Sequence, residues 1–263
     1  MDKIKLAGEI AQIARRAGAA ILSVYANVNE MPVELKPDDS PLTLADKAAN
    51  DIITSGLVQL DIKFPIISEE MKEVPYEERC QYEHYWLVDP LDGTKEFLKH
   101  NGEFTVNIAL VAKDKPIIGI VFVPVTDEMY WAVEGEGAYL ERKGEQVQIH
   151  ASEFDIHDVG LNVVCSRSHL NAETTGFIEQ LKQPNLLSKG SAIKFLILAR
   201  GEAHLYPRMG YTSEWDTCPA QLILEEAGGK IIDWETKMPM RYNKVSLQNH
   251  YFVAYGKVAP PLG

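Results

Sequence analysis

Val88-Asp89-Pro90-Leu91-Asp92-Gly93-Thr94 places two carboxylates three residues apart, directly after an apolar run typical of a strand. Pro90 lacks a backbone N–H and has a fixed φ, so we expect the chain to turn between the aspartates rather than continue as a strand. Gly93 lets the backbone approach a ligand closely. The amides of Gly93 and Thr94 then begin a short helix-like segment, where they suit a phosphate oxygen.

This turn combines groups that bind cations with groups that bind an anion. Carboxylates hold hard divalent cations and a helix start holds phosphate, which together indicate metal-assisted phosphate chemistry. A bare Asp-x-x-Asp is most often a solvated turn, and that alternative stays open. The full Asp-Pro-Leu-Asp-Gly-Thr after a strand is far rarer, which favours a functional site.

Composition limits the class of protein. The 263 residues have 46% hydrophobic and 24% charged residues, which is ordinary for a globular chain of one large domain or two lobes. The net charge of -12 argues against general nucleic-acid binding, because no basic surplus can replace counterions. It allows a small polyanionic substrate if cations and a few local Lys or Arg supply the attraction.

The expected compartment is the cytoplasm. The widely spaced Cys80, Cys165 and Cys218 predict free thiols rather than a disulfide framework. Charges are spread through residues 1–28, so we expect no signal peptide, and the sequence has no apolar run of about 18 residues that would predict a membrane span. The oligomeric state stays open, as does a peripheral position on the cytoplasmic face of the inner membrane.

The first half of the chain is expected to be α+β with a mostly antiparallel sheet. Residues 3–25 predict an amphipathic helix whose core-facing side includes Ile4 and Ile10. A second helix is expected from Thr43, where Asp46 has capping-box spacing and therefore a purely structural alternative role. Strands are expected over residues 65–68, 85–88, 104–110, 117–123, 129–133, 138–142 and 147–149.

Three local patterns in this half carry further expectations. Apolar residues alternate with polar or small ones over 104–110, which predicts a half-buried strand. The acidic segment that ends at Arg79 predicts an exposed loop. Gly135-Glu136-Gly137 could be taken for a dinucleotide loop, but no helix pattern follows, so a hairpin turn is favoured.

The second half alternates strands and helices, which predicts an α/β arrangement. Pro219 is expected in the first turn of the last helix, and Gly228-Gly229 ends it. Because repeats and low-complexity linkers are lacking, residues 1–155 and 156–263 are expected to form two lobes of a single functional unit. Helices are expected over 171–181, from Ser191 as N-cap to Arg200, and over 217–227; strands are expected over 161–165, 203–206, 230–234 and 251–255.

Four acidic residues share one sequence context. Glu69 and Asp89 end strand-like runs, Asp92 follows at the turn, and Asp216 begins a late helix. Carboxylates within about 4 Å of one another repel by several kcal/mol at an effective dielectric near about 20, so such a cluster needs cations. Two or three Mg²⁺ ions would satisfy it and could supply both a nucleophilic water and charge stabilisation for a phosphate ester.

The chain resembles the inositol monophosphatase superfamily. The resemblance rests on Ser68-Glu69-Glu70, Asp89-Pro90-Leu91-Asp92-Gly93-Thr94 and Trp215-Asp216, which occur in the family's order and span nearly the whole chain. It implies a layered α/β/α/β/α sandwich of the sugar-phosphatase type. It also implies a Mg²⁺-dependent, lithium-sensitive phosphatase.

Finer features resemble the bacterial 3′(2′),5′-bisphosphate nucleotidase branch. That branch implies hydrolysis of adenosine 3′,5′-bisphosphate, a by-product of sulfate assimilation, to AMP and phosphate by a metal-activated water. Whether 3′-phosphoadenylyl sulfate competes as a substrate stays open. The features are Lys36 with residues 40–46, residues 85–89, Lys95-Glu96-Phe97, residues 101–109, Ser166-Arg167-Ser168-His169, residues 190–194 and Tyr206-Pro207-Arg208.

The resemblance implies a role for each motif residue. Asp46 and Thr94 would orient and deprotonate the attacking water. The implied metal ligands are the carboxylates of Glu69, Asp89, Asp92 and Asp216 and the carbonyl of Leu91. The implied substrate contacts are Glu69, Leu91, Asp92, Asp216, the amides of Gly93 and Thr94, and, toward the second phosphate, Ser191, Lys194 and Arg208 with His169 nearby.

Plainer explanations stay open for the outer residues. Ser191 could be only a helix cap, Lys194 a solvated helix residue and His169 a loop histidine, while Cys218 is favoured as a packing residue over a nucleophile. Two departures from the branch, Pro219 and Leu247-Gln248-Asn249-His250, leave the substrate preference open. The alternative functions are an inositol monophosphatase or broad sugar phosphatase, and a non-catalytic metal- and phosphate-binding regulator, which is disfavoured because no expected ligand is missing.

Overall fold

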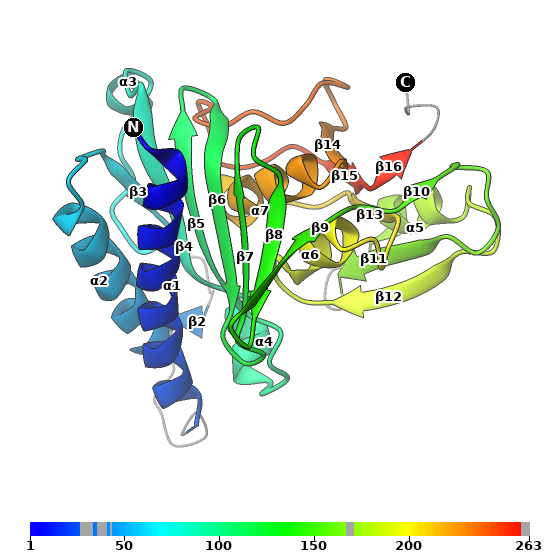
Figure 1. Cartoon of the computed structure of the whole chain (residues 1–263). Coiled ribbons are helices and arrows are strands. Elements are labelled where there is room, and N and C mark those ends of the chain that lie inside the picture. The colour runs from blue at the N-terminus through cyan, green and yellow to red at the C-terminus, as the bar shows by residue number, and fades with distance from the viewer. Residues whose placement is uncertain (27–33, 36–40, 43, 167–170, 259–263) are drawn as a thin grey trace.

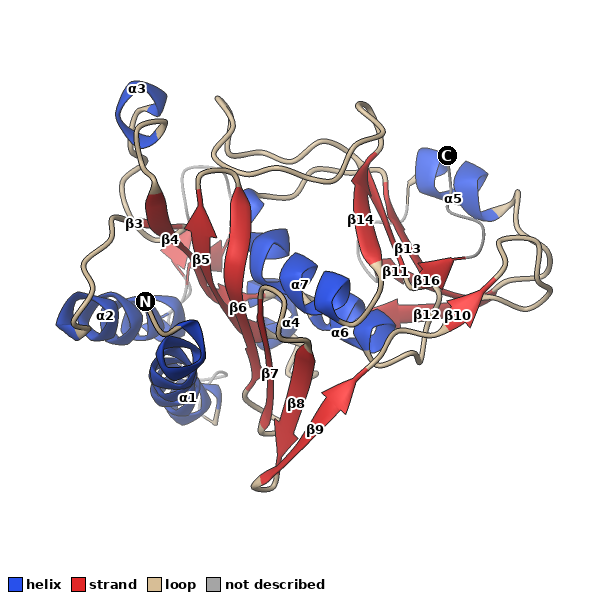
Figure 2. Cartoon of the chain, turned by 45° about the horizontal axis from the view of Figure 1, so that its top comes forward, coloured by secondary structure: helices blue, strands red, loops and turns tan. Residues whose placement is uncertain are grey.

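Helices and sheets alternate in layers through the molecule (Figure 1). This computed structural model describes residues 1–26, 34–35, 41–42, 44–166 and 171–258. Two helices cover one face of a seven-stranded sheet, two more lie between it and a five-stranded sheet, and a fifth covers the outer face of the second sheet (Figure 2). The expected α/β/α/β/α sandwich is thereby confirmed. In layer order these helices are α1 (Lys3–Tyr25), α2 (Leu44–Gln59), α7 (Glu214–Glu226) with α6 (Ile193–Ala199), and α5 (Ala172–Ile178).

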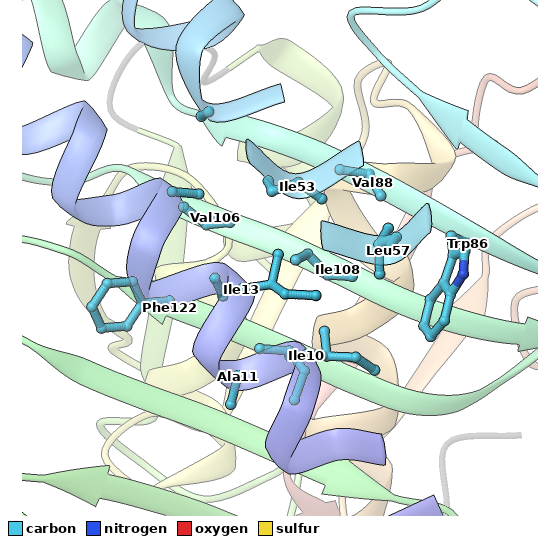
Figure 3. Close-up of a cluster of buried hydrophobic side chains, with 14 of the residues drawn as sticks. Ile10, Ala11, Ile13, Ile53, Leu57, Trp86, Val88, Val106, Ile108 and Phe122 are labelled. Atoms are coloured by element: carbon cyan, nitrogen blue, oxygen red, sulfur yellow. The ribbon is translucent and has the colours of Figure 1, made fainter. Parts of the chain in front are cut away.

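Helix α1 has the predicted bounds and packs its apolar stripe on the sheet. Asp2 caps it, and Ile10 is fully buried in a core shared with α2 and the sheet (Figure 3). Ile4, however, is 45% exposed, so its expected place in the core is wrong. At about 100° per residue Ile4 lies roughly 120° around the helix from Ile10, and Leu6 fills that end of the core instead.

The seven-stranded sheet has its strands in sequence order, and only the β3–β4 pair is parallel. This confirms the expected, mostly antiparallel first half, and Gly135 and Gly137 lie in a hairpin turn as predicted. The strands are β3 (Ile66–Ser68), β4 (His84–Asp92), β5 (Thr105–Ala112), β6 (Lys115–Val123), β7 (Glu128–Val133), β8 (Ala138–Arg142) and β9 (Glu145–Ile149).

Two predictions about the central strands are wrong. Strand β4 does not end before Pro90 but continues to Asp92, with a register shift against β5 between Asp89 and Asp92. A bulge therefore accommodates the missing N–H of Pro90 within the strand. Strand β5 is buried on both faces rather than one, because α2 and α1 cover one side of the sheet and α7 the other.

The segment before β4 is also more ordered than expected. It contains the short helix α3 (Tyr76–Arg79), and the Arg79 side chain is fully buried instead of exposed. Its guanidinium donates to the Asn243 side chain at 2.8 Å and to the backbone carbonyls of Lys244 and Val245 at 2.6 and 2.7 Å. A long-range contact that the local acidic pattern cannot reveal therefore buries this charge.

The second half is α/β, as expected: its five-stranded sheet has two parallel and two antiparallel pairings, and only β15 runs against the other four strands. Helix α7 begins at Glu214, so Pro219 lies inside it and not in its first turn. In order across the sheet, its strands are β12 (Asn185–Lys189), β11 (Asn162–Ser166), β13 (Leu205–Arg208), β15 (Phe252–Tyr255) and β14 (Lys230–Asp233). Two short strand pairs lie outside both large sheets: β1 (Glu34–Leu35) with β2 (Pro41–Leu42), and β10 (Glu153–Phe154) with β16 (Lys257–Val258). The short helix α4 (Thr94–Leu98) follows β4.

Candidate metal and phosphate site

Three chain segments bring their carboxylates to one point. Glu69 directly follows β3, and its amide donates to the Val88 carbonyl at 3.2 Å, so the parallel β3–β4 pairing places it beside Asp89. Asp216 belongs to the capping box at the start of α7, where the Ser213 amide donates to its carboxylate at 2.8 Å. Carboxylate oxygens of Glu69, Asp89 and Asp216 all lie within 4.8 Å of one another.

The carboxylates of this triad repel one another. Burial, and then the negative charges of neighbours led by Glu69, raise the pKa of Asp89 well above its usual value. Burial, then the charges of Asp92 and Glu69, do the same to the pKa of Asp216. A converging set of oxygen donors, with Asp89 buried and Glu69 and Asp216 half-buried, fits a hard divalent cation, which would relieve this repulsion.

Asp92 lies next to the triad rather than within it, since the group that closes to 4.8 Å contains only Glu69, Asp89 and Asp216. Its carboxylate accepts from the Asn107 side chain at 3.4 Å and from the Thr105 hydroxyl at 3.5 Å. Burial raises its pKa, while the charge of Lys194, the backbone amide of Ala192 and the hydrogen bond from Asn107 oppose the shift. Asp92 thus faces both the triad and the cationic side of the site, and its role as a metal ligand stays a prediction.

Asp46 and Thr94 come from different layers and meet beside the turn. Asp46 is buried in the first turn of α2, and the Thr94 hydroxyl lies 3.4 Å from its carboxylate and 3.4 Å from the Leu91 carbonyl. The turn before Thr94 needs a glycine. Gly93 has φ 98°, and a Cβ there would lie only 3.0 Å from the Glu103 carbonyl oxygen. The proposed Thr43–Asp46 capping box is not testable, since Thr43 lies outside the described residues.

The structure contradicts the plainer explanations for two of the outer residues, Lys194 and Ser191. Lys194 is buried, its ammonium donates to the Ser191 carbonyl at 2.6 Å, and burial lowers its pKa to about 8, so it is not a solvated residue. Ser191 is not the helix cap: α6 begins at Ile193, with Ala192 in the cap position, and Ser191 has φ 45°. Arg208 donates to the Tyr211 carbonyl at 3.1 Å, whereas His169 lies outside the described part of the chain.

One pocket joins the acidic and basic groups. It has a volume of about 290 Å³ and is open to solvent at one side. Cys218 is not part of its lining but lies in the core, where burial raises the pKa of its thiol, as expected for a packing residue. The charged and polar residues that line the pocket include Glu69, Asp89, Asp92, Thr94, Lys95, Glu96, Ser166, Lys189, Ser191, Lys194, Arg208 and Asp216, and Leu91 and Gly93 also line it.

Several residues that hold the site in place were not predicted. Ser213 and Asp216 have capping-box spacing in the sequence, so this pair could have been found. Asn249, fully buried, donates to the Ser213 carbonyl and to the Thr217 hydroxyl at 3.1 Å, which fixes the start of α7. Because Asn249 lies far from α7 in the sequence, no local pattern marks this contact.

The family model for inositol monophosphatases matches residues 5–259, nearly the whole chain. The chain belongs to the inositol monophosphatase family. Family membership explains the ordered set of acidic motifs and the two-sheet layering described above. Among the described residues, no helix is long and apolar enough to cross a membrane.

Several relatives of high sequence identity are named bisphosphate nucleotidases. The chain is 45% identical to the 3′(2′),5′-bisphosphate nucleotidase CysQ of Salmonella typhimurium over 87% of this chain and 91% of that protein. It is also 45% identical to CysQ of Escherichia coli K12 over 89% and 92% of the two chains. The crystal structure of CysQ from Bacteroides thetaiotaomicron superposes with a TM-score of 0.83 at 38% identity, covering 96% and 97%.

Raising the pH should increase the stabilisation of this protein by Mg²⁺. Since the pKa values of Asp89 and Asp216 are raised on folding, the metal-free folded state binds more protons than the unfolded chain above the ordinary carboxyl pKa. Its stability therefore falls as the pH rises through the raised values, and Mg²⁺ must compete with fewer protons there. Thermal unfolding with and without Mg²⁺ at about pH 5.5 and about pH 8 measures this effect; a Mg²⁺-induced gain in Tm that shrinks at the higher pH contradicts it.

Proposed function

We propose that this protein is a Mg²⁺-dependent nucleotidase that hydrolyses adenosine 3′,5′-bisphosphate to AMP and phosphate. The observation that carries the proposal is the single pocket in which the carboxylate triad faces the cationic side chains of Lys194 and Arg208. Binding of a monophosphate needs only the carboxylate triad with its metal ions, whereas a second phosphate also needs the side chains of Lys194 and Arg208. The relatives at 45% identity over most of the chain are named for bisphosphate nucleotidase activity.

In this proposal Glu69, Asp89 and Asp216 hold Mg²⁺, with Asp92 and the Leu91 carbonyl completing a second site. Bound Mg²⁺ would neutralise charge on the phosphate and make a nearby water more acidic. Asp89 is buried and Asp216 half-buried, which strengthens their attraction for a cation relative to fully exposed carboxylates. The same residues would bind Li⁺ in place of Mg²⁺, so lithium inhibition is part of the proposal.

Asp46 and Thr94 form the proton-handling pair. The hydroxyl of Thr94 lies between the Asp46 carboxylate and the turn that carries Asp92 and Gly93. A water that donates to Thr94 would pass its proton toward Asp46 as it attacks phosphorus. The contact of 3.4 Å is longer than an ideal hydrogen bond and is expected to shorten when substrate is bound.

Lys194 and Arg208 bind the phosphate that is not cleaved. Because the pKa of Lys194 is lowered to about 8 by burial, its ammonium is still mostly charged at neutral pH and is poorly compensated by solvent. A phosphate dianion at this position would raise that pKa and gain a strong charge-assisted hydrogen bond. The site therefore favours a substrate with two phosphates over one with a neutral hydroxyl group in the second position.

The substrate comparison is the test. Phosphate release from adenosine 3′,5′-bisphosphate, inositol 1-phosphate and fructose 1,6-bisphosphate is measured at equal Mg²⁺, and we expect kcat/KM to be highest for the nucleotide. In Lys194→Met we expect the loss to be larger for the nucleotide, by about tenfold or more, than for inositol 1-phosphate. Faster turnover of inositol 1-phosphate by the wild type would overturn the nucleotidase assignment, and nucleotide binding without turnover would favour a regulator.

Two organisational proposals accompany this function. Residues 1–155 and 156–263 would act as two lobes of one unit, which is supported by the origin of Glu69 and Asp89 in the first lobe and Asp216 in the second. Helix α7 also contacts both sheets. The expected cytoplasmic location is supported by Cys80, Cys165 and Cys218, none of which forms a disulfide in the described chain.

A further inference from the structure

Glu103 lies between the phosphate-binding turn and the segment that carries Lys194. Its carboxylate accepts from the Gly190 amide at 2.8 Å and pairs with the Lys189 ammonium at 3.2 Å. The Glu103 side chain is 13% exposed, whereas the Lys189 side chain is 41% exposed, so the carboxylate and not the ammonium is shielded from water. A carboxylate held by a backbone amide and an ammonium fixes both partners more firmly than an exposed ion pair does.

The two backbone segments on either side of Glu103 are packed without room for side chains. A Cβ at Gly93 would lie 3.0 Å from the Glu103 carbonyl and 3.2 Å from the Ser191 side chain. A Cβ at Gly190 would lie 2.9 Å from the same carbonyl. Ser191 itself has φ 45°, a conformation that a serine holds only when its surroundings enforce it.

This enforced conformation has a consequence at the acidic site. Directly after Ser191 the Ala192 amide lies close enough to the Asp92 carboxylate to lower the pKa of that group, and the Ser191 side chain lies beside Gly93, the residue that follows Asp92. The Ser191 carbonyl accepts from the Lys194 ammonium at 2.6 Å. The position of the 190–194 segment thus sets the orientation of one acidic and one basic group of the pocket.

We propose that Glu103 is a positioning residue for Asp92 and Lys194: by holding the Gly190 amide, it fixes the segment whose Ser191 packs beside the Asp92–Gly93 turn and binds the Lys194 ammonium. In this proposal Glu103 contacts neither the substrate nor a metal ion. The inference rests on the proposed function of the pocket, since it assigns Asp92 to cation binding and Lys194 to phosphate binding. Loss of a residue that positions a metal ligand typically weakens metal binding by about 10–100-fold.

The test compares Glu103→Ala and Glu103→Gln with the wild type, using Mn²⁺ titration by calorimetry and steady-state kinetics with adenosine 3′,5′-bisphosphate. We expect Glu103→Ala to weaken Mn²⁺ binding by about tenfold and to raise KM for the nucleotide. Glu103→Gln keeps an oxygen acceptor for the Gly190 amide but loses the ion pair with Lys189, so its loss should be about threefold.

Glu226→Ala is the matched control. The Glu226 carboxylate also accepts from two turn amides, those of Gly135 and Gly137, both at 2.8 Å. It lies near the opposite end of α7 from Asp216, roughly 15 Å along the helix. The control should lower Tm as Glu103→Ala does, yet leave Mn²⁺ binding and KM unchanged.

The outcomes separate this inference from the proposed function. Equal losses of Tm in Glu103→Ala and Glu226→Ala, with unchanged Mn²⁺ binding in both, would overturn the positioning role. If Glu103→Ala does not fold, Glu103→Gln decides, and unaltered Mn²⁺ affinity and KM in that variant also overturn it. A wild type that binds Mn²⁺ but releases no phosphate from the nucleotide refutes the proposed function, while the Mn²⁺ comparison still reports on Glu103.

Discussion

Replacing Asp89 with Asn should abolish Mg²⁺-dependent phosphate release and leave the protein folded. Asp89 is fully buried at the centre of the carboxylate triad, and its neutral amide isostere cannot supply the charge that holds a divalent cation. Cation-derived charge stabilisation is worth several kcal/mol, so kcat/KM should fall by at least about a thousandfold. Asp216→Asn should behave in the same way, since its carboxylate belongs to the same triad.

The stability of the metal-free protein offers an independent check on Asp89→Asn. Burial and neighbouring carboxylates raise the Asp89 pKa well above its usual value, so its charged form destabilises the folded state at neutral pH. Removing this charge should raise the Tm of the metal-free protein while eliminating the further gain from Mg²⁺. Substantial turnover in the Asn variant, or a normal Mg²⁺-induced gain in Tm, would contradict the assignment.

Asp233→Asn is the control, because its expected change in the Tm of the metal-free protein has the opposite sign. Asp233 is also a buried aspartate, and although burial alone would raise its pKa, hydrogen bonds from the Thr236 amide and His250 lower the pKa below the usual value. Its carboxylate therefore stabilises the folded protein above the ordinary carboxyl pKa, and that stability is lost as the pH falls through the lowered value. The control should lose Tm at neutral pH but keep its Mg²⁺-dependent activity.

Asp46→Asn and Thr94→Ala should each lower kcat by about 10²–10⁴-fold with little change in the affinity for Mg²⁺. The two side chains contact each other, and neither is part of the carboxylate triad. If they transfer one proton as a unit, the double variant should be no slower than the slower single variant. Thr94→Ser keeps the hydroxyl and should retain most of the activity.

Comparison of kcat and Tm in the single and double variants distinguishes a catalytic role of these residues from a structural one. A purely structural Asp46, as helix-start spacing alone would allow, predicts a loss of Tm in Asp46→Asn without a specific loss of kcat. Independent effects that multiply in the double variant would show that the residues do not share one proton path. Calorimetric titration with Mn²⁺ serves as the control, because its affinity should match the wild type in all four variants.

The central strands show where reasoning from the sequence stopped. Alternation of apolar and small residues in 104–110 was interpreted as a half-buried strand, yet α7 covers the second face and buries β5 completely. Pro90 was expected to end its strand, but pairing of Asp92 with Thr105 beyond the bulge continues β4. In both cases the tertiary neighbours of a strand, which lie far away in the sequence, overrode its local pattern.

The same division applies to the candidate site. The locally encoded parts were correct: the turn at Gly93, the strand that ends before Glu69, and a helix near Asp216. The parts that depend on distant contacts were not foreseen, including the burial of Lys194, the left-handed Ser191 and the clamp by Glu103. Their common cause is packing between the two halves of the chain.

By itself, the sequence determined the chemistry available to this protein: which oxygen donors exist, which of them follow strands, and that a glycine turn adjoins them. These features depend on spacings of a few residues, over which backbone sterics and hydrogen bonding act directly. Only the tertiary structure decided that Glu69, Asp89 and Asp216 close to within 4.8 Å while Asp92 stands beside them. That geometry is set by the pairing of β3 with β4 and by the packing of α7 between two sheets, and contacts of this kind are fixed by the whole core rather than by any local stretch.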